Sequence, residues 1–337
     1  MKLPADRVHQ LRKHYDGKPV CVTGGAGFIG GHLVDVLLSI GAKVTVIDDL
    51  CNSTLENLAQ LIELEPERVR FVHGSILDDE ALQDACQDAR VVFHLAALGS
   101  VPRSVEEPQR TWSVNATGTL RVLEAARKSK SDRVVFAASS SAYGDQPNLP
   151  KVETQPSQPL SPYATSKLAG EELCYTWSQC YGLSTACLRY FNIFGPRQSA
   201  DSAYAAVIAA FAKRLLSGEA PTIFGDGEQT RDFTFVANAV LATLLAGSAP
   251  KPLRGNVMNI GTARRVSLNE LAAVMMKLTE SQPHHTPTHA PIRAGDVRHS
   301  LADITVAREL IGYEPFATLE SGLAETIEWY RRAFAGT

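Results

Sequence analysis

A tyrosine and a lysine four residues apart, Tyr163 and Lys167, are the side chains best suited to chemistry in this sequence. Residues at this spacing share one face of a helix, so the segment YATSK would place a phenol beside an ammonium. A nearby positive charge favours phenolate and lowers the pKa of a tyrosine from about 10, which would make it a general base. By itself the spacing also arises by chance.

Three consecutive serines, Ser139, Ser140 and Ser141, directly follow the apolar run Val134–Ala137. Ligands bind at the carboxyl ends of parallel strands, so these hydroxyls would stand where a substrate is held. The alternative is that they only cap the following turn.

A glycine motif follows the first apolar run, Val20–Thr23. Gly24, Gly27 and Gly30 have GxxGxxG spacing. The first two would let the backbone turn sharply and approach a pyrophosphate at the positive end of a helix, and Gly30 would let that helix lie close to the sheet. The motif alone is weak because glycine turns are common.

The acidic pair Asp48-Asp49 strengthens the motif, because Asp48 ends the second predicted strand. A carboxylate there accepts hydrogen bonds from a ribose diol and repels a 2′-phosphate, so the sequence favours NAD over NADP. The alternative is that Asp48 merely caps a turn.

The elements that must position these residues form an alternating pattern. Short β-rich runs without polar alternation lie at Val20–Thr23, Val44–Asp48, Val69–His73, Val91–Leu95, Val134–Ala137 and Thr185–Leu188, with helical periods between them. Such strands are buried on both faces, as in a parallel sheet covered by helices. We therefore predict an α/β fold with a Rossmann-type doubly wound parallel sheet.

The pattern changes after Arg189. Shorter helices, interrupted by glycine and proline, are predicted at Ala203–Ser217, Val236–Gly247, Ser267–Thr279, Ile304–Ile311 and Leu319–Phe334. This organisation predicts an N-terminal extension (1–17), an NAD-binding domain (18–190) and a smaller, mixed C-terminal substrate lobe (191–337), with some chain crossing back to the first domain.

Composition narrows the class of protein. The net charge of −3 over 337 residues argues against nucleic acid as a partner. The longest apolar run, Ala203 to Ala212, is about half a membrane span. The polar N-terminus is no secretory signal, and six cysteines without a CxxC pair suggest reduced thiols in a cytoplasmic protein. The histidine-rich segment Pro283–Pro291 is interpreted as a loop, and no metal is expected.

Longer strings carry a family resemblance. TGGAGFIG (23–30), HLAA (94–97), SSSAYGD (139–145), YATSK (163–167) and RYFNIFGPRQ (189–198) occur in the order typical of extended short-chain dehydrogenases/reductases. HLAALGSVPRS (94–104), AYAAVI (203–208), GDGEQTRDF (225–233) and RAGDVRHSLADI (293–304) are similar to bacterial UDP-N-acetylglucosamine 4-epimerases of O-antigen polysaccharide pathways. The resemblance covers nearly the whole chain.

The resemblance implies a reaction. Tyr163, as phenolate, would take the proton from the sugar 4-hydroxyl, with Ser139 hydrogen-bonded to that hydroxyl and Lys167 holding the nicotinamide ribose. Hydride would pass from C4 to tightly bound NAD, the 4-keto sugar would turn, and hydride would return to its other face. UDP-GlcNAc and UDP-GalNAc would interconvert, and possible further substrates are UDP-Glc and UDP-Gal.

The resemblance also implies binding residues. The cofactor contacts would be Gly24, Gly27, Phe28, Ile29, Gly30, Asp48, Asp49, Asn52, Ser53, Ser75, Ile76, Leu95, Ala96, Ala97, Asn115, Tyr163, Lys167 and Tyr190. The substrate contacts would be Gly99, Ser100, Ser140, Ser141, Asn192, Gln198, Ala206, Val207, Phe224, Arg231, Arg293 and Ser300. Arg231 and Arg293 would clamp the diphosphate, unless they form only surface ion pairs.

Three positions bear on specificity. Ser75 stands where many relatives have an adenine-binding Asp, which weakens that contact. Gly99 replaces a lysine of the galactose-pathway epimerases, and Ser300 occupies the gatekeeper position where a tyrosine would exclude 2-acetamido sugars. Both leave room for a larger 2-substituent, and volume alone gives preference rather than exclusion, about 1–3 kcal/mol.

Related activities are the alternatives. Sugar 4,6-dehydratases need an Asp-Glu pair where Ser140-Ser141 stand, and UDP-glucuronate 4-epimerases or decarboxylases would need a cation for the carboxylate, which the sequence does not reveal. A non-enzymatic NAD sensor would have no reason to keep Ser139, Tyr163 and Lys167 together. The resemblance further implies a homodimer through a four-helix bundle of 110–129 and 163–181.

Overall fold

A seven-stranded parallel sheet forms the centre of the protein. The computed structural model describes residues 2–200, 206–280, 286–291 and 297–335. The strands stand in the order β11-β6-β5-β4-β1-β2-β3, and every neighbouring pair is parallel. Their bounds are β1 Pro19–Thr23, β2 Lys43–Asp48, β3 Val69–His73, β4 Val91–His94, β5 Arg133–Ser139, β6 Ser184–Tyr190 and β11 Arg254–Ile260. The predicted doubly wound fold is confirmed, with its switch point between β1 and β4.

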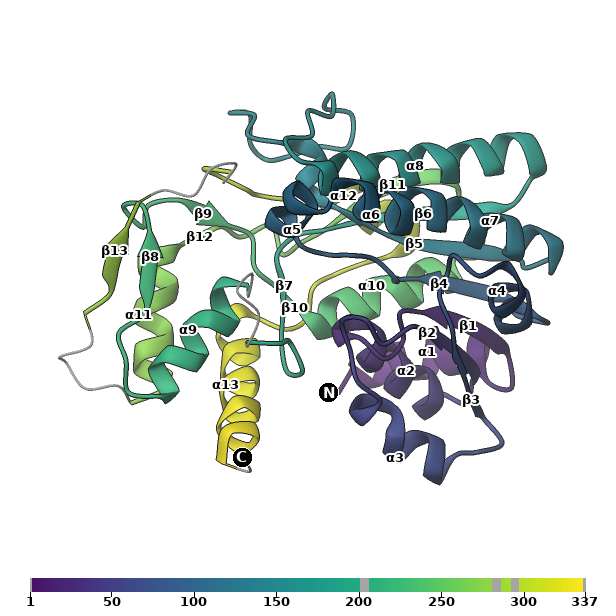
Figure 1. Ribbon diagram of the computed structural model, residues 1–337, viewed down its shortest axis with the longest axis horizontal. Helices are drawn as coiled ribbons and strands as arrows, with labels where there is room; N and C mark the ends of the chain where they lie inside the picture. Colours follow the sequence, from purple (N-terminus) through teal and green to yellow (C-terminus); the bar gives the residue numbers. More distant parts are fainter. Residues whose placement is uncertain (1, 201–205, 281–285, 292–296, 336–337) are drawn as a thin grey trace.

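Helices cover both faces of this sheet (Figure 1). One face carries α1 (Ala5–Tyr15), α2 (Phe28–Ser39), α3 (Glu56–Leu64) and α10 (Val236–Ser248); the other carries α4 (Asp79–Cys86), α7 (Gly118–Lys128) and α8 (Pro162–Tyr181). Neighbouring residues of β1 point into different cores, Val20 and Val22 into one and Cys21 into the other. Burial on both faces explains the uninterrupted apolar strands.

The seventh strand, β11, was not among the predicted strands. It comes from the C-terminal part of the chain and pairs with β6 at the sheet edge. Its first residues are polar, and a register shift lies between Arg254 and Asn256, around Gly255 at φ 75°. A strand that begins with polar residues and a glycine bulge has no continuous apolar run, so the sequence pattern does not predict it. Together with α10, β11 returns the chain to the sheet.

The smaller lobe is mixed, as predicted (Figure 1). Its elements are α9 (Val207–Leu216), α11 (Leu268–Leu278), α13 (Leu319–Ala335) and the short strands β8 (Thr222–Phe224), β9 (Thr230–Arg231), β12 (Val266–Ser267) and β13 (Thr288–Ala290). Parallel β8 and β13 pair, as do antiparallel β9 and β12. A capping box joins Ser267 and Glu270 at the start of α11.

Shorter elements connect these layers. They are α5 (Val101–Glu106), α6 (Pro108–Trp112), a π-helical turn (Ser113–Thr117), a 3₁₀ turn (Ser140–Tyr143), β7 (Ile193–Phe194), β10 (Thr234–Phe235) and α12 (Thr305–Ile311). At the N-terminus, Leu11 and Tyr15 of α1 are fully buried, and the Tyr15 hydroxyl donates to Leu244 O at 2.8 Å. The helix therefore packs firmly onto α10.

Two absences concern only the described part of the chain. No helix there combines the length and apolar character needed to cross a membrane. Nor do the described residues contain a group of three or more His, Cys, Asp or Glu side chains that could hold a metal ion. Part of the histidine-rich segment, 283–285, lies outside them. All six cysteines are free thiols.

A buried histidine, His94, ties the end of β4 to its neighbours. Thr119 Oγ1 donates to Asn115 O, so its oxygen accepts a hydrogen bond from His94 Nε2–H at 2.9 Å. His94 Nδ1 then accepts from the Thr23 hydroxyl at 2.8 Å. The network requires a neutral imidazole, and burial lowers the pKa of His94 to about 3.

This depressed pKa predicts acid-sensitive stability. Below pH 6.5 the unfolded chain protonates this imidazole and the folded chain does not, so stability falls as pH drops towards 4. One such group contributes a slope of up to about 1.4 kcal/mol per pH unit. The free energy of unfolding, measured with denaturant at several pH values between 7.5 and 4.5, should depend less steeply on pH for His94→Gln than for wild type. Equal pH dependence in the two proteins would contradict a neutral His94 in the folded state.

Candidate active site

A large cavity opens at the carboxyl ends of the parallel strands and continues into the smaller lobe. Its volume is about 820 Å³. One side is formed by the glycine loop and the ends of β1, β2 and β4, and the other by α9, β8 and β9. An extended ligand made of two linked halves fits such a shape.

The glycine loop is built for close approach. Gly24 has φ 72°, and a Cβ there would lie 2.7 Å from Ala96 N, so only glycine fits. A Cβ on Gly30 would overlap Gly24 O and lie 2.8 Å from Gly25 Cα. The start of α2 has no side-chain cap at Gly27, which leaves its first N–H groups to face a negatively charged ligand.

Asp48 holds this loop in place. Its carboxylate accepts hydrogen bonds from Ala26 N at 3.0 Å, Leu50 N at 2.9 Å and Ser53 Oγ at 3.1 Å. Asp48 therefore does cap the turn that follows β2, as the alternative interpretation of the sequence expected. A carboxylate offers about four acceptor positions, so one is left for a ribose hydroxyl.

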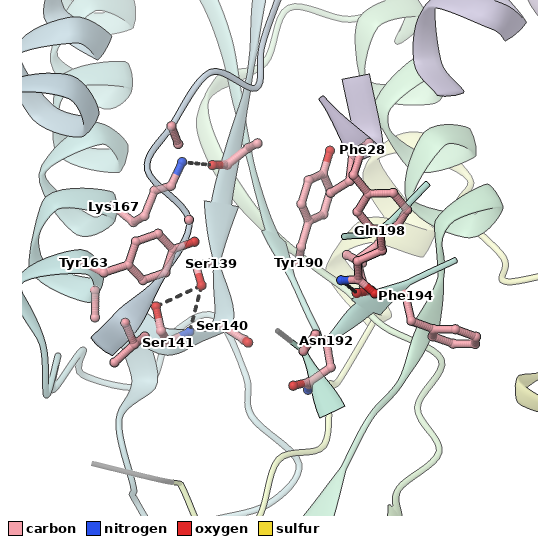
Figure 2. A pocket seen from close by; sticks show the side chains of 18 of the residues that line it. Phe28, Ser139, Ser140, Ser141, Tyr163, Lys167, Tyr190, Asn192, Phe194 and Gln198 are labelled. Carbon is pink, nitrogen blue, oxygen red and sulfur yellow. Dashed lines mark hydrogen bonds between the residues drawn. The ribbon is translucent and has the colours of Figure 1, made fainter. Parts of the chain in front are cut away.

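Tyr163, Ser139 and Lys167 meet on one side of the cavity (Figure 2). The Tyr163 hydroxyl faces Ser139, whose Oγ accepts hydrogen bonds from Ser141 N at 3.2 Å and Ser141 Oγ at 2.8 Å. Lys167 Nζ donates to Ala137 O at 2.8 Å and lies 4.9 Å from the centre of the Phe136 ring. Ser139 caps the next turn and also faces the phenol.

Burial dominates the ionisation of this pair. It raises the pKa of Tyr163 above its usual value, and the hydrogen bond with Ser139 offsets only part of that rise. Burial also lowers the pKa of Lys167 to about 8, against the opposing influence of Glu171 and Cys174. The expectation that Lys167 lowers the pKa of Tyr163 is thus outweighed in the protein alone, because both groups are desolvated.

A buried ion pair supports the lysine from behind. Arg189 Nη2 and Glu171 Oε2 are 2.7 Å apart, and both side chains are only 4% exposed. Glu171 follows Lys167 by one helical turn, and the Arg189 guanidinium stacks 4.5 Å from the Tyr143 ring. The Tyr143 hydroxyl in turn donates to Asn259 Oδ1 on β11 at 2.7 Å. The network fixes α8 against the sheet.

The opposite side of the cavity carries polar groups (Figure 2). Asn192 Nδ2 donates to Asp232 O and Gln198 Nε2 donates to Ile193 O, both at 3.2 Å. Arg231 donates to two backbone carbonyls, at 3.0 and 3.3 Å. Ser300 is 8% exposed at the cavity wall, anchored through its backbone N–H to Thr230 O.

The cavity brings together most residues named from the sequence. Lining it are Gly24, Gly27, Phe28, Ile29, Gly30, Asp48, Asp49, Asn52, Ser53, Ile76, Leu95, Ala96, Ala97, Gly99, Ser139, Ser140, Ser141, Tyr163, Lys167, Tyr190, Asn192, Gln198, Ala206, Val207, Phe224, Arg231 and Ser300. Arg293 lies outside the described residues.

Three named residues do not line the cavity, and each has a local partner instead. Asn115 uses both ends of its amide on Leu98 and Ser166, so it holds the loop after β4 against α8. Ser100 caps α5, and Ser75 Oγ accepts from the backbone N–H two residues later. In the structure these side chains serve local hydrogen bonds, and their contact with a ligand stays a prediction.

The sequence missed several lining residues, among them Tyr143, Lys151, Gln229 and His299. Tyr143 and Gln229 lie inside strings that carried the resemblance, but nothing in their spacing distinguishes them from core residues. Lys151 follows a loop, and its backbone pairs with that of Ala302, far along the chain.

The doubly wound sheet, the glycine loop and the Ser–Tyr–Lys set define an extended short-chain dehydrogenase/reductase. A model of the NAD dependent epimerase/dehydratase family matches residues 20–261, and the chain belongs to that family. The resemblance seen in the sequence is confirmed.

Relatives of known structure and sequence agree. The chain is 39% identical over 312 residues to a UDP-glucose 4-epimerase of Mycolicibacterium smegmatis, covering 92% of this chain and 97% of that protein. A UDP-N-acetylglucosamine 4-epimerase from Methanobrevibacter ruminantium in complex with UDP-N-acetylmuramic acid is 38% identical, with a TM-score of 0.88 over 94% of this chain and 99% of that one. The structure of a Thermotoga maritima UDP-glucose 4-epimerase with UDP-glucose is 38% identical in sequence. Its TM-score is 0.87, over 94% of this chain and 99% of that one.

NAD is the cofactor, as the sequence predicted, and the site fits it. The uncapped start of α2 and the side-chain-free surface of the glycine loop would receive the pyrophosphate, and Asp48 keeps an acceptor for the adenosine ribose. Tyr163 and Lys167 stand at the other end, where the nicotinamide would lie.

The tight packing at Gly30 yields a prediction. In Gly30→Ala the new methyl group forces α2 away from the glycine loop. The amount of NAD that stays bound to the protein through purification should therefore fall at least about tenfold. It is measured as the nucleotide absorbance released when the protein is precipitated with acid. Gly31→Ala is the matched control, because its Cβ would meet only side-chain atoms, the nearest at 3.3 Å. Normal NAD content in Gly30→Ala would contradict the packing argument.

Proposed function

We propose that the protein is a UDP-hexose 4-epimerase that interconverts UDP-GlcNAc and UDP-GalNAc and also accepts UDP-Glc and UDP-Gal. One observation carries the proposal: Tyr163 and Ser139 face the middle of a cavity whose two ends suit a dinucleotide and a second nucleotide. The family and the relatives support it.

In the proposed reaction, Tyr163 takes the proton of the sugar 4-hydroxyl while Ser139 hydrogen-bonds that oxygen. When bound, NAD supplies reversible hydride acceptance at C4. Lys167, held by Ala137 O, is placed to bind the nicotinamide ribose and to stabilise the phenolate. Tyr163 returns the proton after the keto sugar has turned, so no net oxidation occurs.

The space around the hexose supports an acetylated substrate. A Cβ on Gly99 would meet no atom within 4 Å, which leaves open space at this wall. Ser300 presents only a small side chain to the same cavity. Arg231, at the far end, would hold the diphosphate, together with Arg293 by resemblance.

The related activities are weighed by particular side chains. Dehydration lacks its acid and base, because Ser140 and Ser141 occupy the turn after Ser139. UDP-glucuronate 4-epimerisation has one observation in its favour, since Lys151 supplies a cavity-lining ammonium that the sequence had not revealed. That ammonium donates to Gln146 O, so we place this activity second.

We propose a homodimer as the working assembly. Apolar side chains of α6, α7 and α8 remain exposed: Trp112 (48%), Leu120 (40%), Tyr175 (53%) and Tyr181 (55%). Because α8 contacts both α6 and α7, pairing this face between two copies would bury these side chains in a four-helix bundle.

The primary test uses purified protein and no added cofactor. UDP-GlcNAc should be converted to UDP-GalNAc until the two sugars reach equilibrium. Chromatography of the nucleotide sugars measures the conversion. Tyr163→Phe should lower turnover at least about 100-fold, because it removes the acid/base group, and should retain NAD. A 4-keto-6-deoxy product would indicate a dehydratase, conversion of UDP-GlcA alone would favour the second activity, and no product would refute the proposal.

The gatekeeper expectation has its own test. Ser300→Tyr should lower kcat/KM for UDP-GlcNAc roughly tenfold or more relative to UDP-Glc, because the ring fills space that the acetamido group needs. Ser300→Ala, which keeps the space, should leave the ratio unchanged. An equal loss on both sugars would refute the idea.

A further inference from the structure

A buried carboxylate, that of Asp232, stands next to the cavity-lining Arg231 in the chain. Asp232 is fully buried and does not line the cavity, and no role was assigned to it from the sequence. A buried carboxylate is costly unless hydrogen bonds or ion pairs satisfy its oxygens. The partners of this carboxylate therefore show what it holds in place.

Four hydrogen bonds reach the carboxylate. Asp232 Oδ1 accepts from Thr262 N at 2.8 Å and from Thr262 Oγ1 at 2.7 Å. Asp232 Oδ2 accepts from Ala263 N at 3.0 Å and from Ala302 N at 3.2 Å. Both oxygens face backbone N–H groups, which can only donate, so the place requires an acceptor on each side. An amide could supply that acceptor on one side only.

The donors come from parts of the chain far from Arg231. Thr262 and Ala263 lie in the loop directly after β11, the edge strand of the central sheet. Ala302 lies in the segment that also contains Ser300. The carboxylate therefore ties the end of β9, which lies in the smaller lobe (Figure 1), to the central sheet.

Other bonds around β9 keep the Arg231 guanidinium with its own strand. β9 pairs with β12, and Arg231 Nη1 donates to Thr230 O and Arg298 O at 3.0 and 3.3 Å. The place of the guanidinium relative to Tyr163 therefore depends on how β9 is attached to the sheet on which α8 packs. The carboxylate is the attachment that lies next to Arg231 in the chain.

We propose that Asp232 is a positioning residue for substrate binding, which holds the Arg231 guanidinium at a fixed place relative to Tyr163. The inference rests on the proposed function, in which Arg231 holds the diphosphate and Tyr163 acts on the sugar. A guanidinium that is already in place loses less freedom when the diphosphate binds, which improves affinity. The contribution of Asp232 passes through Arg231, because the carboxylate itself does not line the cavity.

A double-mutant cycle tests the proposal, with UDP as the probe in calorimetry on the NAD-loaded enzyme. Asp232→Asn keeps the shape but sets an NH₂ group against a backbone N–H, so UDP should bind at least about tenfold more weakly. The content of bound NAD should stay at the wild-type level. In the Arg231→Ala background, Asp232→Asn should change UDP affinity less than about twofold, because the group that it positions is already absent.

Tyr313→Phe is the matched control. It removes a hydrogen bond of another fully buried side chain at this junction, to Gly261 O at 2.9 Å, and leaves the carboxylate in place. UDP affinity should stay within about twofold of wild type even where the melting temperature falls. If Asp232→Asn does not fold, Thr262→Val replaces it in the cycle. This variant removes only the hydroxyl donor, and the expected loss of UDP affinity is about threefold.

Three results would overturn the inference. The first is a double variant in which the losses of the two substitutions add. The second is unchanged UDP affinity in Asp232→Asn, or in Thr262→Val where that variant replaces it. The third is an equal loss in Tyr313→Phe, since any loosening of the junction would then suffice. A wild-type protein that does not bind UDP would refute the proposed function itself, and the inference with it.

Discussion

Keeping an ammonium charged inside the protein is the constraint on which this site depends. Burial by itself favours the neutral amine of Lys167, and the surroundings oppose it with Ala137 O, the face of Phe136 and the negative charge of Glu171 one turn away. Glu171 can remain ionised at 4% exposure only because Arg189 is paired with it. A charged Lys167 therefore depends on the buried ion pair of Glu171 and Arg189 next to it.

The same network joins the two halves of the molecule. Tyr143 lies against Arg189 and bonds Asn259, and Asn259 Nδ2 donates to the carbonyl oxygens of Lys151 and Asp303. Because Asn259 belongs to β11, these bonds fix the segment directly after Ser300 to the sheet on which α8, the helix of Tyr163, packs. Hydrogen bonds from Asn259 thus fix the segment after Ser300 relative to Tyr163.

The sequence predicted what local rules determine. The glycine spacing, six apolar strands and the Tyr163–Lys167 pair depend on nearby residues, and the structure has all of them. Other features depend on partners far along the chain: the strand β11 behind Gly255, and the role of Asn115, whose amide is used by Leu98 and Ser166. The raised pKa of Tyr163 could not be predicted either, because the spacing to Lys167 indicates a neighbouring charge but not how deeply the phenol is buried.

A hexose that must turn within its site while its nucleotide stays bound needs unequal walls. In the proposed reaction, the nucleotide would lie at the end of the cavity near Arg231, where fixed groups such as Gln229, whose Nε2 donates to Phe224 O, form the wall. The hexose would lie where the wall leaves space, since a Cβ on Gly99 would meet no atom within 4 Å. Fixed polar contacts around the hexose would favour one face of the sugar and slow the turn, so binding energy is better placed on the part that does not move.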